Sequence, residues 1–176
     1  MATLENERTF SLHFDVVLRP ARRSDLSKLE WFGQYTHFRR LFARTFEEQI
    51  QGRRMMLVAD LGGFPVGQIF IHFSDADHVA GNRLWRGYLY ALRVLEPLRR
   101  QGIGTQLIRE AESILTRQGY RWGVIAVAKD NPGARQLYER LGYVVFADDP
   151  GIWHYVDHEG QTHKVVEPAW MLQKTL

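Results

Sequence analysis

A basic, glycine-spaced turn near the middle of this 176-residue sequence has the residue types of an anion-binding site. Arg99 and Arg100 precede Gly102 and Gly104, at the point where an apolar run ends and an amphipathic segment begins. A helix that starts there leaves backbone N–H groups unpaired, and its dipole favours negative charge at that end. Glycine removes the Cβ atoms that would keep an anion away from the backbone. The spacing therefore predicts a site for a phosphate or a pyrophosphate.

Two other phosphate-binding motifs are excluded by neighbouring residues. A dinucleotide fingerprint requires a third glycine, but Gln106 and Leu107 follow Gly104. A P-loop requires a lysine between its last glycine and a serine or threonine, and Gly104 is followed directly by Thr105. Taken alone, the glycines are also compatible with an ordinary tight turn between a strand and a helix.

The segments around the turn predict a strand, a helix and a second strand. Residues 84–94 are mainly apolar, and alternate residues from Tyr88 to Val94 share one face. Residues 122–127 predict the next strand, which runs parallel to the first if the helix is a normal crossover. The inward positions of that helix recur at helical spacing and are Ile103, Leu107, Ala111, Ile114 and Leu115.

A second motif, residues 131–143, predicts a short helix with Asn131 as N-cap and Pro132 at its first position. Tyr138 lies on the inward face of this helix, and Gly142 ends it. By spacing alone, Tyr138 is a buried core tyrosine.

Together, residues 92–105 and 131–143 resemble motifs A and B of the GNAT superfamily of N-acetyltransferases. The resemblance spans residues 16–174 and implies one α/β domain covering residues 1–176, with residues 1–11 as a loose leader. The implied fold has a central mixed, mostly antiparallel sheet, whose parallel fourth and fifth strands splay apart, flanked by about four helices. Acetyl-CoA is the implied co-substrate and an amine the acceptor, with no metal.

The resemblance also assigns roles to residues. The strand before motif A carries a bulge, and its freed backbone binds the pantetheine arm and polarises the thioester carbonyl. Tyr138 would protonate the leaving thiolate, since a phenol with a pKa near 10 is protonated at neutral pH. The implied cofactor-binding residues are Leu92, Val94, Arg99, Arg100, Gln101, Gly102, Ile103, Gly104, Thr105, Asn131 and Arg135.

The sequence departs from the family pattern in two places. Glu96-Pro97 replaces the usual Pro-Glu order before the basic turn, which we interpret as a shifted loop. The strand before motif B, which carries a basic glutamate in many relatives, has no carboxylate over residues 124–127. Glu96 is one candidate for the general base, and a water relayed by Tyr88, Tyr90 or the backbone is the other.

Two further segments concern the site for the acceptor amine. An apolar stripe over residues 38–50 predicts a helix that packs on the sheet, and the resemblance implies that Tyr35, His37 and Phe38 at its start line the acceptor site. Residues 152–156 and 164–166 predict an extra hairpin before a last strand at 170–174. There we expect exposed histidines at 154, 158 and 163, with His154 as a candidate acceptor-site residue.

Earlier segments predict a strand at 14–18, a helix capped by Ser24 or Asp25, and a hairpin of residues 55–59 and 66–73. Residues 74–82 predict a solvated loop rather than a metal site.

Composition limits the alternatives. The chain has no cysteine, no apolar run long enough for a membrane span and a net charge of only +3, so we expect a cytoplasmic monomer or homodimer that binds neither membranes nor nucleic acid. Two other functions stay open: a non-catalytic acyl-CoA-binding module, and a toxin-like acetyltransferase acting on charged tRNA.

Overall fold

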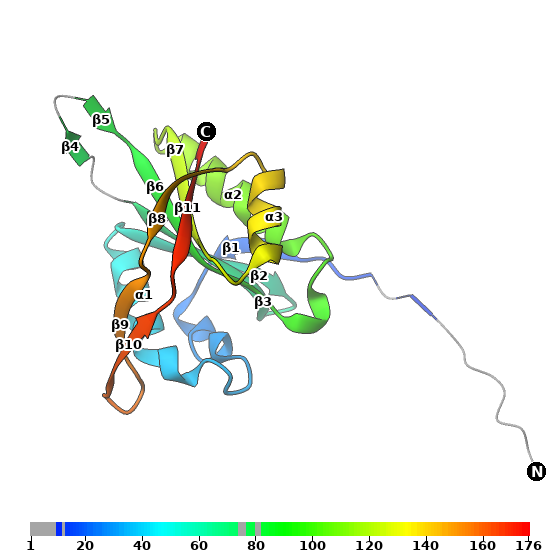
Figure 1. Ribbon diagram of the computed structural model, residues 1–176. Coiled ribbons are helices and arrows are strands. Elements are labelled where there is room, and N and C mark those ends of the chain that lie inside the picture. The colour runs from blue at the N-terminus through cyan, green and yellow to red at the C-terminus, as the bar shows by residue number, and fades with distance from the viewer. Residues whose placement is uncertain (1–9, 12, 74–76, 80–81) are drawn as a thin grey trace, which may run out of the picture.

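The computed structural model describes residues 10–11, 13–73, 77–79 and 82–176, and these are built around a seven-stranded sheet (Figure 1). Its strand order is β1-β2-β3-β6-β7-β11-β8. All neighbours are antiparallel except β6 and β7, which are parallel. The strands are β1 (Val17–Pro20), β2 (Arg54–Leu61), β3 (Phe64–Phe73), β6 (Arg86–Val94), β7 (Trp122–Ala128), β8 (Val144–Asp149) and β11 (Ala169–Thr175).

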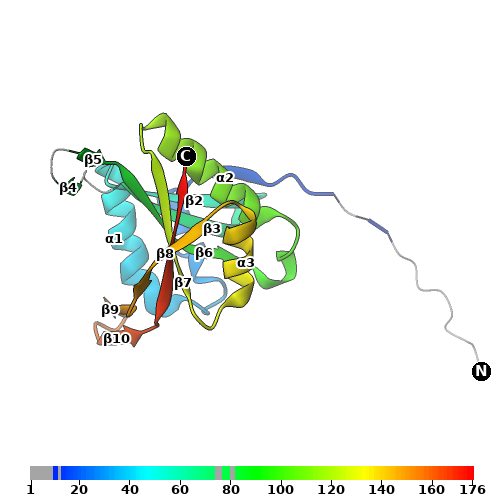
Figure 2. The same cartoon turned by 45° about the horizontal axis from the view of Figure 1, so that its top comes forward.

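Three α-helices flank the sheet, with α1 on one side of the strands and α2 and α3 on the other (Figure 2). The described elements also include four short 3-10 helices and two separate hairpins. The helices are α1 (Arg39–Ile50), α2 (Ile103–Arg117), α3 (Pro132–Arg140), η1 (Arg23–Asp25), η2 (Lys28–Glu30), η3 (Thr36–Phe38) and η4 (Glu96–Leu98). The hairpins pair β4 (Asp77–Val79) with β5 (Asn82–Leu84), and β9 (Ile152–Val156) with β10 (Thr162–Val166).

The predicted architecture is confirmed. The parallel strands expected as fourth and fifth are β6 and β7, because the short β4–β5 hairpin precedes them. Helix α2 begins and ends where its apolar periodicity predicts, and all five of its predicted inward residues are buried. The expected leader lies largely outside the described residues. The described part of the expected loop at 74–82 forms strands instead, because β4 covers Asp77–Val79 and β5 begins at Asn82.

Alternating residues divide the core between the two faces of the sheet. On β2, Leu57 and Ala59 join the cluster under α2, whereas Met56 and Val58 join the cluster under α1. The first cluster also contains Tyr138 of α3, and the second contains Phe38, Phe42 and Phe46 beside α1. Neighbouring residues of β6 likewise pack into opposite clusters, Leu89 into the first and Tyr90 against the second.

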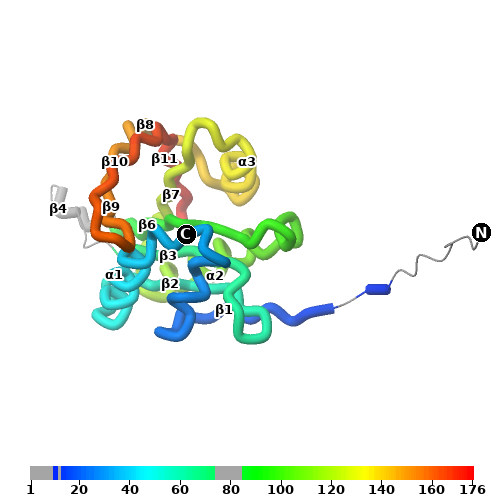
Figure 3. Tube along the Cα trace, turned by 90° about the horizontal axis from the view of Figure 1, so that it is seen from below, coloured from blue at the N-terminus to red at the C-terminus, as the bar shows by residue number. Residues whose placement is uncertain are grey.

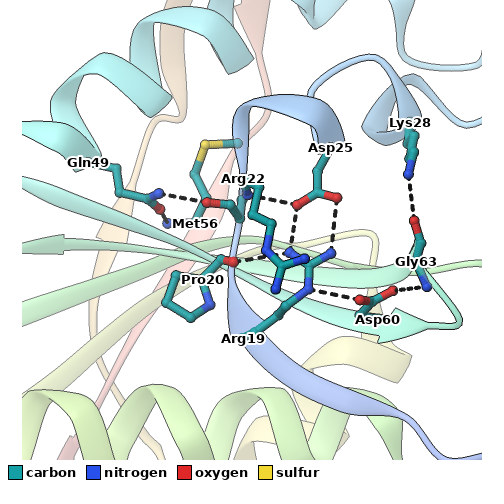
Figure 4. A network of polar contacts seen from close by, with 10 residues as sticks. Arg19, Pro20, Arg22, Asp25, Lys28, Gln49, Met56, Asp60 and Gly63 are labelled. Carbon is teal, nitrogen blue, oxygen red and sulfur yellow. Dashed lines mark hydrogen bonds and ion pairs between the residues drawn. The ribbon is translucent and has the colours of Figure 1, made fainter.

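The segment before α1 differs from the expectation, because 3-10 turns replace the predicted capped α-helix. Asp25 is fully buried and accepts two hydrogen bonds from Arg19, at 2.6 and 3.0 Å, and one from the Arg22 N–H at 2.7 Å (Figure 4). Arg19 also donates to Asp60 at 2.8 Å. Burial raises the pKa of Asp25, but these hydrogen bonds outweigh it and leave the pKa below its usual value. The network fixes β1 and η1 against β2.

At the C-terminal end, the sequence analysis missed the edge strand β8, which pairs with β11. The predicted hairpin is present as β9–β10 and projects toward α1 (Figure 3). The two ends of its segment meet at a narrow neck, because Glu167 N–H donates to the Gly151 carbonyl at 3.0 Å. Gly151 has a φ of 63°, and a Cβ there would lie 1.7 Å from the Glu167 carbonyl oxygen. Only glycine fits this neck.

Helices long and apolar enough to span a membrane are absent from the described part of the chain.

Candidate active site

Strands β6 and β7 separate along their length. Their parallel pairing covers only the first residues of each, with Arg86 opposite Trp122 and Leu89 opposite Ile125. Beyond these pairs β6 continues to Val94 and β7 continues without a β6 partner. One edge of each strand is therefore unpaired at the carboxyl ends, where backbone groups are available to a ligand.

A bulge in β6 lies at the start of this separation. The register against β3 shifts between Gln68, which faces Arg93, and Phe70, which faces Tyr90. Ala91 in the bulge has a φ of 53°, a left-handed conformation that costs free energy in a residue other than glycine. The buried side chain of Gln68, 1% exposed, donates to the Ala91 carbonyl at 3.2 Å. This contact holds the strained backbone in place.

Strand β6 leads through η4 into the glycine-spaced turn, and α2 begins directly after it. Arg100 has a φ of 62° and Gly102 a φ of 85°, and a Cβ at Gly102 would meet no atom within 4 Å. Among the described residues, no side chain caps the first turn of α2, so its N–H groups have no acceptor of that kind. Arg99 and Arg100 are exposed beside it, and Arg99 Nε donates to the Val94 carbonyl at 3.1 Å. The open backbone and two cations suit a pyrophosphate.

The remaining predicted residues of this turn lie at the start of α2. Gln101 is exposed, Ile103 is buried in the core, and Gly104 and Thr105 are half-buried. A Cβ at Gly104 would lie 3.8 Å from Val94 and 3.9 Å from Leu137, so α2, β6 and α3 meet closely here.

Helix α3 brings Tyr138 into the core near the separated strands. Asn131 caps the helix, as predicted, by accepting from the Ala134 N–H at 3.1 Å. Tyr138 is 5% exposed, and burial, with a smaller contribution from nearby Tyr88, raises its pKa to about 12. The phenol is therefore protonated over the whole physiological range.

Two other predicted residues lie farther from this core. Arg135 pairs with Glu139 at 2.8 Å, and its guanidinium lies over the Trp170 ring. Glu96 is exposed on η4, on the phosphate side of the bulge. The two tyrosines on β6 differ: Tyr90 accepts a hydrogen bond from Arg54 at 2.7 Å, whereas Tyr88 lies close enough to Asp149 for that carboxylate to contribute to its raised pKa, after burial.

Aromatic side chains from η3 and the β9–β10 hairpin pack together opposite the bulge. The Phe38 ring lies 5.0 Å from the Tyr155 ring and 6.3 Å from the Trp153 ring, and His37 lies 5.9 Å from Tyr155. Burial, followed by the charge of Arg93, lowers the pKa of His37. His154 is exposed and alternates to the other face of its strand. The hairpin thus forms a wall with the Tyr35–Phe38 segment.

The expectation of an exposed, unpaired histidine is wrong for His163. Its Nε2 lies 2.6 Å from Asp157 Oδ2, and its ring stacks on Tyr155 at 5.0 Å. Asp157 also accepts from the Glu159 and Gln161 N–H groups at 2.9 Å and shapes the hairpin turn. The hydrogen bond with His163, against the effect of desolvation, lowers the pKa of Asp157 to about 2. His154 and His158 are exposed, as expected.

Sequence reasoning missed Gln68, Arg93 and Asp149 at this site. No local motif marks them, because a buried glutamine on a strand and an arginine between apolar neighbours acquire their roles only from strand pairing. The one available signal was Gln68, a polar residue in the middle of the mainly apolar β3.

A mixed sheet that opens between two parallel strands, with a bulged strand leading into an anion cradle, defines a GNAT-like α/β fold. Residues 23–143 match the acetyltransferase (GNAT) family model. The chain therefore belongs to the GNAT family of acetyltransferases, which confirms the family predicted from motifs A and B.

One curated relative is similar to part of the chain. The chain is 34% identical over 58 residues to N-alpha-acetyltransferase 30 of Schizosaccharomyces pombe, which is 33% of this chain and 39% of that relative. The match thus spans less than half of the curated relative.

Solved structures share the fold over nearly the whole chain. The structure of Arabidopsis thaliana NAA60 in complex with acetyl-CoA has a TM-score of 0.71 at 19% identity, covering 92% of this chain and 99% of that one. The ribosomal-protein-S18-alanine N-acetyltransferase of Escherichia coli has a TM-score of 0.66 at 19% identity, covering 92% and 94%.

Proposed function

We propose that this protein transfers an acetyl group from acetyl-CoA to a primary amine, on a small molecule, an amino acid or a peptide N-terminus. The observation that carries the proposal is the strained bulge at Ala91, held at the opening between β6 and β7 and followed, after η4, by the cradle. Membership of the acetyltransferase family supports it. So does the similarity in fold to a structure described as a complex with acetyl-CoA.

The cofactor would lie along β6. Residues 99–105 would hold the pyrophosphate through the N–H groups of the first turn of α2 and the two arginines. The backbone of Leu92 and Val94 would hold the pantetheine arm, with the Asn131 side-chain amide from the other side. Arg135 would reach a phosphate only by leaving Glu139 and Trp170.

In the chemical step, the neutral amine attacks the thioester carbonyl carbon and the carbon–sulfur bond breaks. A backbone N–H of the bulge stabilises the negative charge that develops on the carbonyl oxygen. Tyr138 donates its proton to the departing thiolate sulfur, and the proton that the attacking nitrogen loses as the amide forms restores the phenol. Because no covalent enzyme nucleophile is needed, positioning of the two substrates supplies much of the rate.

The ammonium proton must leave before attack. Tyr88 is a better water relay than Tyr90, because the Tyr90 hydroxyl already accepts from Arg54. Glu96 and Asp149 are the carboxylates to test as the base, the first beside the cradle and the second near Tyr88. Separate Glu96→Gln and Asp149→Asn variants distinguish them, since loss of the base raises the pH at which the rate reaches half its maximum.

A non-catalytic acyl-CoA-binding module is the second candidate function. It is favoured by one observation, the absence of a carboxylate from β7, where residues 122–128 contain none. An enzyme acting on charged tRNA would require salt-sensitive RNA binding, which filter binding at two salt concentrations measures.

The deciding experiment combines acetyl-CoA calorimetry with thiol release against pooled amines, amino acids and N-terminal peptides. A Gly102→Glu variant should lose acetyl-CoA binding, since it adds a negative charge and a side chain at a φ of 85°. The matched control is Gly62→Glu, at a left-handed turn glycine with open space around it, far along the chain from the cradle. Full acetyl-CoA affinity in Gly102→Glu would refute the cradle assignment. Tight binding without thiol release from any pool would favour the binding module.

The cytoplasmic location and the state of association remain predictions from the sequence. Cell fractionation and light scattering measure them directly.

A further inference from the structure

Arg93 lies next to the bulge and points into the aromatic wall. Its guanidinium carbon lies 4.4 Å from the centre of the Tyr35 ring and 5.0 Å from the centre of the Phe38 ring. The side chain is only partly exposed. Desolvation lowers the pKa of Arg93, although nearby Tyr35 and Glu167 oppose this effect. The two rings are nearly parallel, with centroids 6.3 Å apart, and the guanidinium packs against both of them.

No carboxylate of the described residues forms an ion pair with this guanidinium within 4.0 Å. Two other half-buried arginines of the same chain are paired: Arg19 with Asp25 and Asp60, and Arg54 with Glu48. Removing a cation from water without a paired anion is unfavourable, so proteins usually pair or hydrogen-bond such a group. The missing anion is therefore to be sought in a ligand.

The surroundings of Arg93 fit an acceptor rather than the cofactor. Its side chain is on the α1 face of the sheet with Tyr35, Phe38 and Tyr155, whereas the cradle is at the start of α2. Glu167, whose negative charge raises the pKa of Arg93, also borders a surface hollow of about 470 Å³. The hollow is lined by Lys129, Asp130, Val165, Val166, Glu167 and Pro168.

We propose that Arg93 is a specificity-determining residue that binds a carboxylate carried by the acceptor amine. The substrate class is then a free amino acid, or a peptide whose N-terminal residue is acidic. A carboxylate matches the two parallel N–H groups of a guanidinium edge. Arg93 follows the bulge by two residues, so a carboxylate bound there places an amine a few bonds away beside the bulge. The inference rests on the acetyl transfer proposed above.

The test compares acceptors that differ only in the carboxylate. L-Phenylalanine is paired with L-phenylalaninamide, and a peptide beginning with aspartate with the same peptide beginning with asparagine; the two pairs distinguish a free amino acid from an acidic N-terminus. Each is measured with wild type, Arg93→Met, which keeps an apolar stem between the rings, and Arg93→Lys. Arg39→Met is the control, because Arg39 lies outside the wall, at the exposed start of α1, and pairs with Glu30 at 2.6 Å.

Wild type should prefer the carboxylate member of at least one pair by about tenfold or more in kcat/KM. Arg93→Met should abolish that preference by raising KM for the carboxylate member alone, and Arg93→Lys should restore part of it. Arg39→Met should change neither value. An equal loss for both members of a pair, or a preserved preference in Arg93→Met, would overturn the proposal.

A binding measurement separates this inference from the proposed activity. N-Acetyl-L-phenylalanine, a product that retains the carboxylate, is titrated calorimetrically into wild type and Arg93→Met in the presence of CoA, with N-acetylphenethylamine as the uncharged comparison. Binding of the acid to wild type but not to Arg93→Met supports the carboxylate site even if no acceptor is turned over. Equal binding of acid and uncharged probe refutes it, whatever the activity assays show.

Discussion

Replacing Tyr138 by phenylalanine removes a single hydroxyl from a ring that stays 5% exposed. The proposed role of that hydroxyl is to protonate the leaving thiolate. Burial and nearby Tyr88 raise its pKa to about 12, so the donor form is fully populated from pH 6 to pH 10. General acid catalysis contributes about 10²- to 10⁴-fold in rate. A free thiol in water has a pKa near 8.5, which makes its anion a good leaving group, so we expect the lower end.

The expected result is a fall in kcat of about 10²-fold, or about 2.7 kcal/mol in activation free energy, with the acetyl-CoA dissociation constant unchanged. Thiol release measures the first quantity and calorimetry the second. The wild-type rate should show no loss from phenol deprotonation below about pH 11, because the raised pKa keeps the proton on Tyr138 as the pH increases.

Tyr143→Phe is the matched control for this experiment. Tyr143 is also a buried tyrosine, and its ring lies 6.2 Å from the Tyr138 ring. It lies beside Gly123 and Glu112, away from the opening between the strands. Unchanged kcat in Tyr138→Phe, or an equal fall in both variants, would show that Tyr138 only fills the core.

Three further predictions concern the scaffold. Gln68→Leu removes the hydrogen bond to the bulge at Ala91. We expect kcat/KM to fall by about 10²-fold and the free energy of unfolding to fall by only about 1 kcal/mol. Thiol-release kinetics measures the first and urea unfolding the second, which distinguishes a positioning role from misfolding. Gly87→Ala places a Cβ 2.1 Å from the buried side chain of Leu115 and should cost about 2 kcal/mol, a fall in Tm of about 4–8 °C; an unchanged Tm would contradict this packing. Asp25→Asn should destabilise the fold by about 2–3 kcal/mol at pH 7. The pKa of Asp25 is lower in the folded state than in the unfolded state, so the difference in stability from wild type should shrink as the pH falls below about 4. Urea unfolding at pH 7 and pH 3 measures this difference.

The sequence predicted the elements whose signals are local. The period of α2, the Asn131 cap and the two motifs needed no knowledge of distant contacts, and α2 begins at Ile103 as expected. Strand β8 was missed because it is an edge strand with Val144 and Phe146 exposed, so it shows no alternation. The segment forms a 3-10 turn in which the buried Asp25 accepts from both the Arg22 N–H and the Arg19 side chain, a partner 6 residues away that no local signal reveals.

The acceptor side could not be predicted for a different reason. The pairing of His163 with Asp157 and the stacking of Arg93 on Tyr35 join residues from separate segments of the chain. Such contacts depend on where the β9–β10 hairpin docks, and no spacing within the hairpin encodes this. The proposed cradle could be inferred from the sequence because its donors are backbone groups of one continuous turn.

Because of the neck at Gly151 and Glu167, the β9–β10 hairpin leaves the sheet and returns to it at one place. Its two ends leave the sheet side by side, since Asp149 and Ala169 are register partners, and everything between them reaches the wall without crossing the cofactor cradle. A contiguous replacement of residues 152–166 would therefore exchange one side of the proposed acceptor wall. If the proposed roles hold, such a graft would change the choice of acceptor and leave β6, α2 and α3 unaltered.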